Sequence, residues 1–69
     1  MDHQFQIEGP FIELIGLIKA LGIAQNGGHA KAIVEQGIVY RNGERELRKR
    51  AKLVRGDIIQ IEALKIQLQ

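Results

Sequence analysis

Residues 26–55 read NGGHAKAIVEQGIVYRNGERELRKRAKLVR. The pattern predicts a short helix, a glycine stop, a tight hairpin and then the densest run of positive charge in the chain. Asn26 suits the N-cap of the helix, because its side-chain oxygen can accept a hydrogen bond from backbone N–H groups two or three residues on. Gly37 is the expected end of the helix. The flanking residues are expected to support this stretch.

The hairpin is predicted by Asn42-Gly43, which lies between two short extended runs, residues 38–41 and 44–47. A type I′ turn needs positive φ at both central residues, and Asn-Gly is the pair that tolerates this best. The turn would place Arg41 and Arg45 close to the tip. An irregular basic stretch follows, and Leu53 and Val54 are expected to return to the core.

The flanks complete the core. Residues 4–7 alternate polar and apolar, which favours a short strand. Pro10 suits the first position of a helix, and apolar residues at helical spacing extend that helix to a left-handed cap at Gly22. Phe5 and Phe11 are both expected in the core. Residues 58–62 and 64–69 favour two further strands, the last of which is expected to pair with the N-terminal one.

Length and composition set limits. A chain of 69 residues forms one domain, because a second core could not be built from so few residues. It contains no Cys, which removes thiolate and zinc-thiolate chemistry. No apolar run is long enough to span a bilayer, and the first residues lack the pattern of a secretion signal. We therefore expect a cytoplasmic protein without membrane contact.

Charge is unevenly distributed. Residues 41–55 hold seven basic residues and two acids, a net charge of +5, whereas the rest holds three lysines and six acids, a net charge of −3. Such asymmetry is typical of a polyanion-binding face, although a solvated surface that maintains solubility is an alternative.

The start of the second helix is a candidate phosphate-binding site. Asn26, Gly27, Gly28 and His29 form its first turn, where unshielded N–H groups and the helix dipole favour an anion. A flexible helix entry is the alternative interpretation. His29 is expected to be a surface residue and not a metal ligand, because no second histidine or carboxylate stands at ligand spacing.

Catalysis finds little support. The chain has no Ser, Thr or Cys to serve as a nucleophile, and neither of its two histidines stands in a pattern with an orienting carboxylate. Binding of nucleic acid requires only cations on a rigid frame. Arginine dominates the basic run, and its planar fork suits bidentate phosphate contacts. Because only Tyr40 is an expected exposed aromatic, recognition should depend on phosphate, shape and 2′-hydroxyl contacts.

Residues 14–62 resemble the αL RNA-binding module named after protein four of the small ribosomal subunit. The same module occurs in pseudouridine synthases, tyrosyl-tRNA synthetases and heat-shock ribosome-rescue factors. The resemblance covers about two-thirds of the chain and is carried by Leu21-Gly22-Ile23-Ala24, Asn26, Ala30-Lys31, Ile33-Val34, Gly37, Val39, Asn42-Gly43 and Gly56-Asp57-Ile58-Ile59. With Arg48-Lys49-Arg50-x-Lys52 included, the chain is most similar to the small stand-alone bacterial members. The resemblance implies an α+β fold in which two packed helices lie on a small, mostly antiparallel sheet of four to five short strands.

The resemblance also implies where RNA would bind: across the start of the second helix and the hairpin. Lys31 matches a basic position of the family's second helix. Gly27 stands where many members have an arginine that meets RNA, and Arg41 stands where an apolar strand residue is usual. Either Arg41 moves charge to the hairpin tip or the strand is frayed there. We expect the basic run to compensate for the missing arginine, which gives the predicted RNA-binding set Lys31, Arg41, Arg45, Arg48, Lys49, Arg50 and Lys52.

The sequence thus predicts a single domain, residues 1–69, that is a monomeric, ribosome-associated and non-catalytic RNA-binding protein. Its expected partner is structured RNA of the ribosomal or transfer type, without a cofactor, a metal or a small-molecule substrate. The alternative is an adaptor whose basic face docks an acidic protein. A helix-turn-helix DNA reader is disfavoured, because the connection between the helices is too long and the second helix carries little basic charge.

Overall fold

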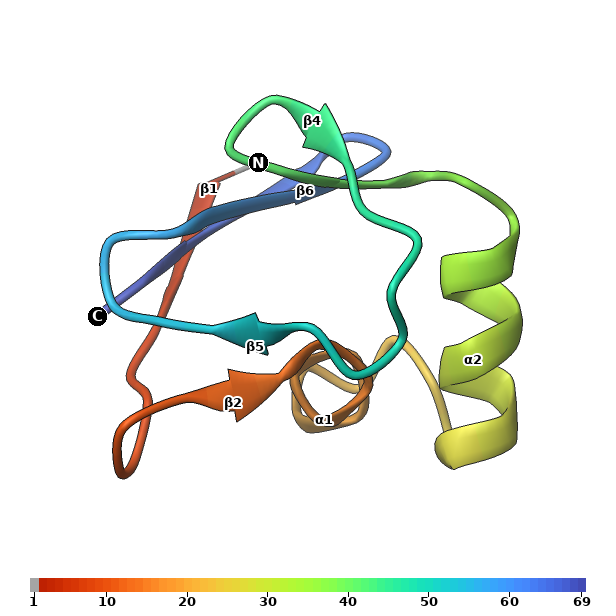
Figure 1. Ribbon diagram of the computed structural model, residues 1–69, viewed down its shortest axis with the longest axis horizontal. Coiled ribbons are helices and arrows are strands. Elements are labelled where there is room, and N and C mark those ends of the chain that lie inside the picture. The colour runs from red at the N-terminus through yellow and green to blue at the C-terminus, as the bar shows by residue number, and fades with distance from the viewer. Residues whose placement is uncertain (1) are drawn as a thin grey trace.

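The structure is a computed structural model and describes residues 2–69. The described chain contains two helices and seven strands (Figure 1). In order, they are β1 (Asp2–Phe5), β2 (Ile12–Glu13), α1 (Leu14–Ala20), α2 (Gly27–Glu35), β3 (Val39–Arg41), β4 (Glu44–Arg45), β5 (Lys52–Leu53), β6 (Ile58–Ile61) and β7 (Leu64–Leu68). Neither helix within residues 2–69 combines the length and apolar character that a membrane crossing needs.

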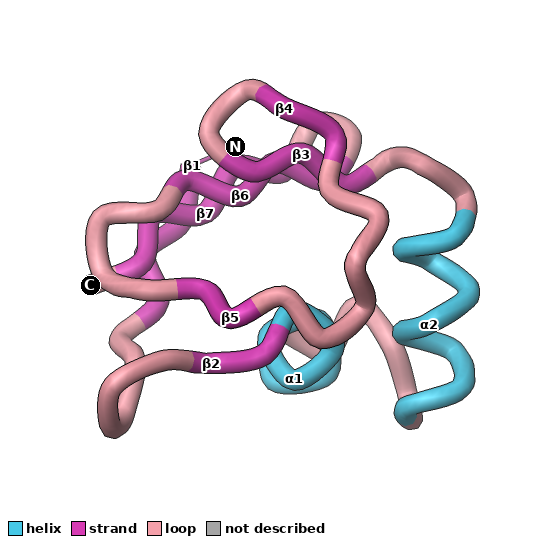
Figure 2. Tube along the Cα trace, in the orientation of Figure 1, coloured by secondary structure: helices cyan, strands magenta, loops and turns pink. Residues whose placement is uncertain are grey.

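The main sheet has five strands in the order β1-β7-β6-β3-β4. Strand β1 pairs with β7 in parallel, whereas the other neighbours are antiparallel. Strands β2 and β5 form a separate antiparallel pair, which lies with α1 below the main sheet, while α2 stands at one side (Figure 2). The predicted α+β fold is confirmed, including the pairing of the last strand with the N-terminal one; the β2–β5 pair was not predicted.

The helices and the main sheet share one apolar core. Leu14, Leu17 and Ile18 of α1 are fully buried, as are Val34 of α2 and Ile59 of β6. Burial of each such side chain contributes about 1.5–3 kcal/mol. The helical spacing of apolar residues therefore identified the inner faces of both helices.

The predicted turn chemistry is present. The Asn26 side chain accepts a hydrogen bond from the His29 N–H at 2.8 Å, which caps α2. Gly37 follows the helix with φ 75°. Asn42 and Gly43 have φ values of 51° and 85°, as the type I′ turn between β3 and β4 requires. The second helix and the hairpin are thus set by local sequence.

Two predictions near the N-terminus are wrong. The first strand is residues 2–5 and not 4–7, and α1 begins at Leu14 and not at Pro10. The chain turns at Gly9, with φ 80°, and residues 12–13 pair with residues 52–53 as strands. Phe11 consequently lies outside the helix and is 36% exposed, contrary to its predicted place in the core.

Candidate nucleic-acid interface

The basic run lies on a fixed backbone. The first N–H groups of α1 donate to this run: Leu14 N–H to the Ala51 carbonyl at 3.0 Å and Ile15 N–H to the Lys49 carbonyl at 3.1 Å. Such donors at a helix start lack partners within the helix. Ala51 is buried and Lys52 already belongs to β5. The stretch between β4 and β5 is irregular, as predicted, but the helix start and the strand pair hold it in place. Leu53 is buried, whereas Val54 is exposed, contrary to its predicted return to the core.

Two shallow hollows lie along this stretch and share Arg41 and Arg48. We call them together the basic groove, defined by its cationic residues. These are Arg41, Arg45, Arg48, Arg50 and Lys52. The other lining residues are Asn42, Glu44, Glu46 and Ala51. The groove thus brings together five of the seven basic residues predicted from the sequence.

Arg41 is tied into the fold beside a buried carboxylate. Its Nε donates to Asp57 Oδ2 at 3.0 Å and its Nη2 to the Lys52 carbonyl at 3.0 Å. Its side chain is 22% exposed. The frayed strand suggested for Arg41 is wrong, because Arg41 pairs with Glu44 and Ile59 within the sheet. Its charge lies next to the hairpin turn, where the side chain clamps β3 to β5 and to the turn before β6.

Asp57 also fixes the hairpin turn. Its Oδ1 accepts from Asn42 Nδ2 at 3.0 Å, and its Oδ2 accepts from the Val54 N–H at 2.9 Å. Burial pushes the pKa of Asp57 upward, but the hydrogen bonds from Val54, Asn42 and Arg41 outweigh it and leave the pKa below the ordinary value of 3.8. Asp57 is therefore an ionised carboxylate that accepts hydrogen bonds from Arg41, Asn42 and Val54.

A second buried carboxylate orients Arg48. Glu46 accepts from the Arg48 side chain through Nε at 3.0 Å and Nη2 at 3.1 Å, and from its backbone N–H at 3.1 Å. Hydrogen bonding to Arg48 lowers the pKa of Glu46 below its ordinary value of 4.5, and the same pairing raises the pKa of Arg48. The side chain of Arg48 is itself well exposed, at 74%. The pair thus holds an accessible cation in one place.

Arg45 lies across the end of α2. Its Nη2 donates to the Tyr40 hydroxyl at 3.2 Å, and its guanidinium carbon lies 5.7 Å from the centre of the Tyr40 ring. Arg45 passes close to Gly37, where its Cδ would make ordinary van der Waals contact, at 3.7 Å, with an added Cβ. A cation near a helix C-terminus is favourable. Tyr40, the predicted exposed aromatic, is thus partly covered by Arg45.

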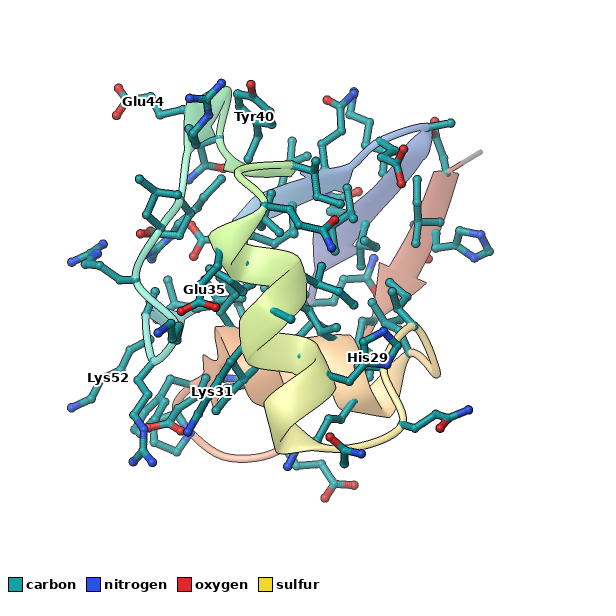
Figure 3. The ribbon with its side chains drawn as sticks, turned by 90° about the vertical axis from the view of Figure 1, so that its right-hand side faces the viewer. His29, Lys31, Glu35, Tyr40, Glu44 and Lys52 are labelled. Atoms are coloured by element: carbon teal, nitrogen blue, oxygen red, sulfur yellow. The ribbon has the colours of Figure 1, made fainter. Side chains whose placement is uncertain are left out.

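Lys31 and Lys49 flank a carboxylate on α2. Lys49 Nζ lies 2.7 Å from Glu35 Oε2, and this contact lowers the pKa of Glu35. Lys31 lies one turn before Glu35 and is exposed. Lys31 and Lys52 extend to the same side of α2, whereas His29 extends to the other (Figure 3). Lys31, on the same side of α2 as the groove residue Lys52, therefore continues the positive surface beyond the groove.

The predicted phosphate-binding site at the start of α2 has its own hydrogen bonds. His29 Nδ1 accepts from the Gln25 N–H at 3.2 Å, and Asn26 accepts from the His29 N–H. The N–H groups of Gly27 and Gly28 have no hydrogen-bond partner within residues 2–69. These two donors remain open to a ligand, at a turn apart from the basic groove. Across residues 2–69, no group of three His, Asp or Glu side chains could hold a metal ion.

Two residues of the site were not identified from the sequence: Glu46 and Asp57. Glu46 carried a local signal, because an acid two residues before an arginine inside a basic run can pair with it. Asp57 follows the Gly56 turn, but its partner Arg41 is sixteen residues away.

Comparison with known proteins identifies a family. The family model described as "S4 domain" matches residues 5–69. In Escherichia coli (strain K12), the protein named "Putative RNA-binding protein YbcJ" is 34% identical over 59 residues, which is 86% of this chain and 84% of that protein. In Shigella flexneri, "Uncharacterized protein YbcJ" has the same identity over the same shares.

Proposed function

The chain belongs to the S4 domain family, and from that premise we propose that it is a non-catalytic RNA-binding protein whose basic groove receives the backbone of structured RNA. A similar protein of Escherichia coli is named for RNA binding. The proposed RNA is of the ribosomal or transfer type, and the proposed setting is the bacterial cytoplasm, with the protein acting as a monomer.

One observation carries the proposal: five cations converge on two adjoining hollows whose walls are fixed. Arg41 and Arg48 are oriented by carboxylates, and Arg45 is held by Tyr40. Cations that are positioned before binding lose less side-chain entropy when they meet phosphates. Arginine also offers bidentate contacts to phosphate oxygens. The groove therefore suits a nucleic-acid backbone.

Arg50 offers the cleanest test, because within residues 2–69 its exposed side chain has no hydrogen bond or ion pair. We expect Arg50→Glu to weaken the binding of a fluorescently labelled RNA stem-loop at least ten-fold, because a phosphate contact is replaced by repulsion. Lys65→Glu is the matched control: it reverses a charge on β7, beside Asp2 and Gln67 and away from the groove. It should change the affinity by less than about three-fold.

Equal losses for both variants would show that only net charge matters and would count against the groove. The adaptor alternative makes a different prediction. If the basic face docks an acidic protein, the tagged wild-type protein should retain its partner after nuclease treatment of the lysate, whereas association through RNA should be lost.

A further inference from the structure

A third hollow, of about 380 Å³, lies beside the segment that leads into β2. Its lining residues are Phe5, Gln6, Glu8, Phe11 and Ile12. Its volume falls within the range of small-molecule sites, about 300–1,000 Å³. We name it the Phe11 hollow. None of its lining residues is among the RNA-binding residues predicted from the sequence.

The walls of the Phe11 hollow are held in position. Ile7 N–H donates to the Gln69 carbonyl at 2.8 Å, and Gln69 N–H donates to the Phe5 carbonyl at 2.9 Å. Arg55 Nη2 donates to the Ile7 carbonyl at 2.9 Å. On the other side, Ile12 pairs with Leu53. The hollow is therefore a formed surface, braced by the C-terminus and by the β2–β5 pair.

The chemistry of the hollow fits a nucleobase better than a phosphate. Glu8 is the only titratable side chain in its lining, and a carboxylate repels a phosphate. Phe5, Phe11 and Ile12 offer apolar surface on which a planar ring can stack. Gln6 can donate and accept, and Glu8 can accept; within residues 2–69 neither side chain has a hydrogen-bond partner. These are the groups that meet the edge of an unpaired base.

Lys52 joins the hollow to the basic groove. It lines the groove, and its Nζ lies 5.0 Å from the centre of the Phe11 ring. Strands β2 and β5 lie side by side (Figure 1), and their register pairs Lys52 with Glu13, two residues after Phe11. The backbone of one RNA strand can therefore lie in the groove as far as Lys52, and the next base of that strand can contact the Phe11 ring.

We propose that the Phe11 hollow binds one unpaired nucleobase of the RNA whose backbone lies in the basic groove. This inference rests on the proposed function and deepens it, because it names the RNA feature that the domain recognises: an unpaired nucleotide next to the backbone that lies in the groove. Phe11 supplies the stacking surface, and Gln6 and Glu8 supply polar contacts to the base edge.

The test compares two stem-loop RNAs that differ at one bulged position, which is either guanosine or an abasic nucleotide. Guanine is the chosen probe because it offers two adjacent N–H donors to a carboxylate. Wild type should bind the guanosine RNA about five-fold or more tightly than the abasic RNA, in keeping with stacking on an aromatic ring. Phe11→Leu should abolish this ratio while it retains the affinity for the abasic RNA and the thermal unfolding midpoint.

Tyr40→Leu is the control, because it removes the aromatic ring beside Arg45, which lies outside the lining of the Phe11 hollow. It should keep the ratio. A ratio of one in wild type, or a ratio lost in Tyr40→Leu but kept in Phe11→Leu, would overturn the inference and leave the proposed function intact. Failure of wild type to bind either RNA would instead count against the proposed function itself.

Discussion

Arg41 Nη2 lies 2.8 Å from Asp57 Oδ2, and through this contact a basic residue of the hairpin is joined to the turn that precedes β6. The same carboxylate holds Asn42 and the Val54 N–H. Asp57 therefore couples the groove's most buried cation to the hairpin turn and to the end of β5. The position of Arg41 in the groove therefore depends on Asp57, which does not line the groove itself.

Replacement of Asp57 by alanine should lower the free energy of unfolding by roughly 2–4 kcal/mol, because three partly buried donors lose their acceptor and each intramolecular hydrogen bond contributes about 0.5–1.5 kcal/mol. Urea denaturation measures this directly. Glu44→Ala is the control: Glu44 lies exposed at the hairpin tip, without an ion pair among the described side chains. It should change the stability by less than about 0.5 kcal/mol. Similar values for both variants would contradict a structural role of Asp57.

Acid should destabilise the protein. The folded-state pKa values of Asp57 and Glu46 lie below their ordinary values, so the unfolded chain binds protons first as the pH falls. The stabilisation is fully present above about pH 5 and is lost as the pH falls through the lowered values. Urea titrations from pH 7 to pH 3 should show this loss. Glu46→Gln should make the decline shallower, and an unchanged pH profile for that variant would exclude Glu46 as a source.

Arg48 and Arg50 should differ when each is replaced by alanine. Both substitutions remove a cation from the groove and should weaken RNA binding. Arg48→Ala also removes the two side-chain hydrogen bonds to Glu46 and keeps only the one from the backbone N–H. We therefore expect a measurable fall in the thermal midpoint for Arg48→Ala and almost none for Arg50→Ala. Equal midpoints would show that the Glu46–Arg48 pair adds no stability.

Glu35 partly neutralises the positive surface around α2. Its Oε2 lies 2.7 Å from Lys49 Nζ, and Lys31 lies one helical turn away. Glu35→Gln should release Lys49 and strengthen RNA binding about two- to five-fold at low salt. Stability should change little, since exposed ion pairs contribute about 0–1 kcal/mol. Weaker binding by Glu35→Gln would mean that the fixed position of Lys49 matters more than its free charge.

Local chemistry made much of the fold predictable. Asn26 caps α2 and Asn42-Gly43 turns the hairpin because each depends on residues within a few positions. The start of α1 was not predictable in this way. Phe11 continues the helical spacing of Leu14 and Ile18, but the pairing of β2 with β5 across forty residues draws the chain into a strand instead. Periodicity contains no information about such a distant partner.

In the candidate site, too, the features set by nearby residues were predictable and those set by distant partners were not. Clustering of basic residues was visible in the sequence, and the structure brings Arg45, Arg48, Arg50 and Lys52 to one groove. The clamp at Arg41 was not visible, because its acceptor Asp57 is distant in sequence. Charge counts cannot distinguish a cation that is free for a ligand from one already engaged by a buried carboxylate.

The central claim is that the basic groove neutralises RNA phosphates, and the salt dependence of binding tests it most directly. Binding of a structured RNA stem-loop should be titrated across a series of salt concentrations. If about five phosphates are neutralised, the logarithm of the association constant should fall against the logarithm of salt concentration with a slope of roughly −3.5 to −4.5. A slope near zero would contradict binding through the groove.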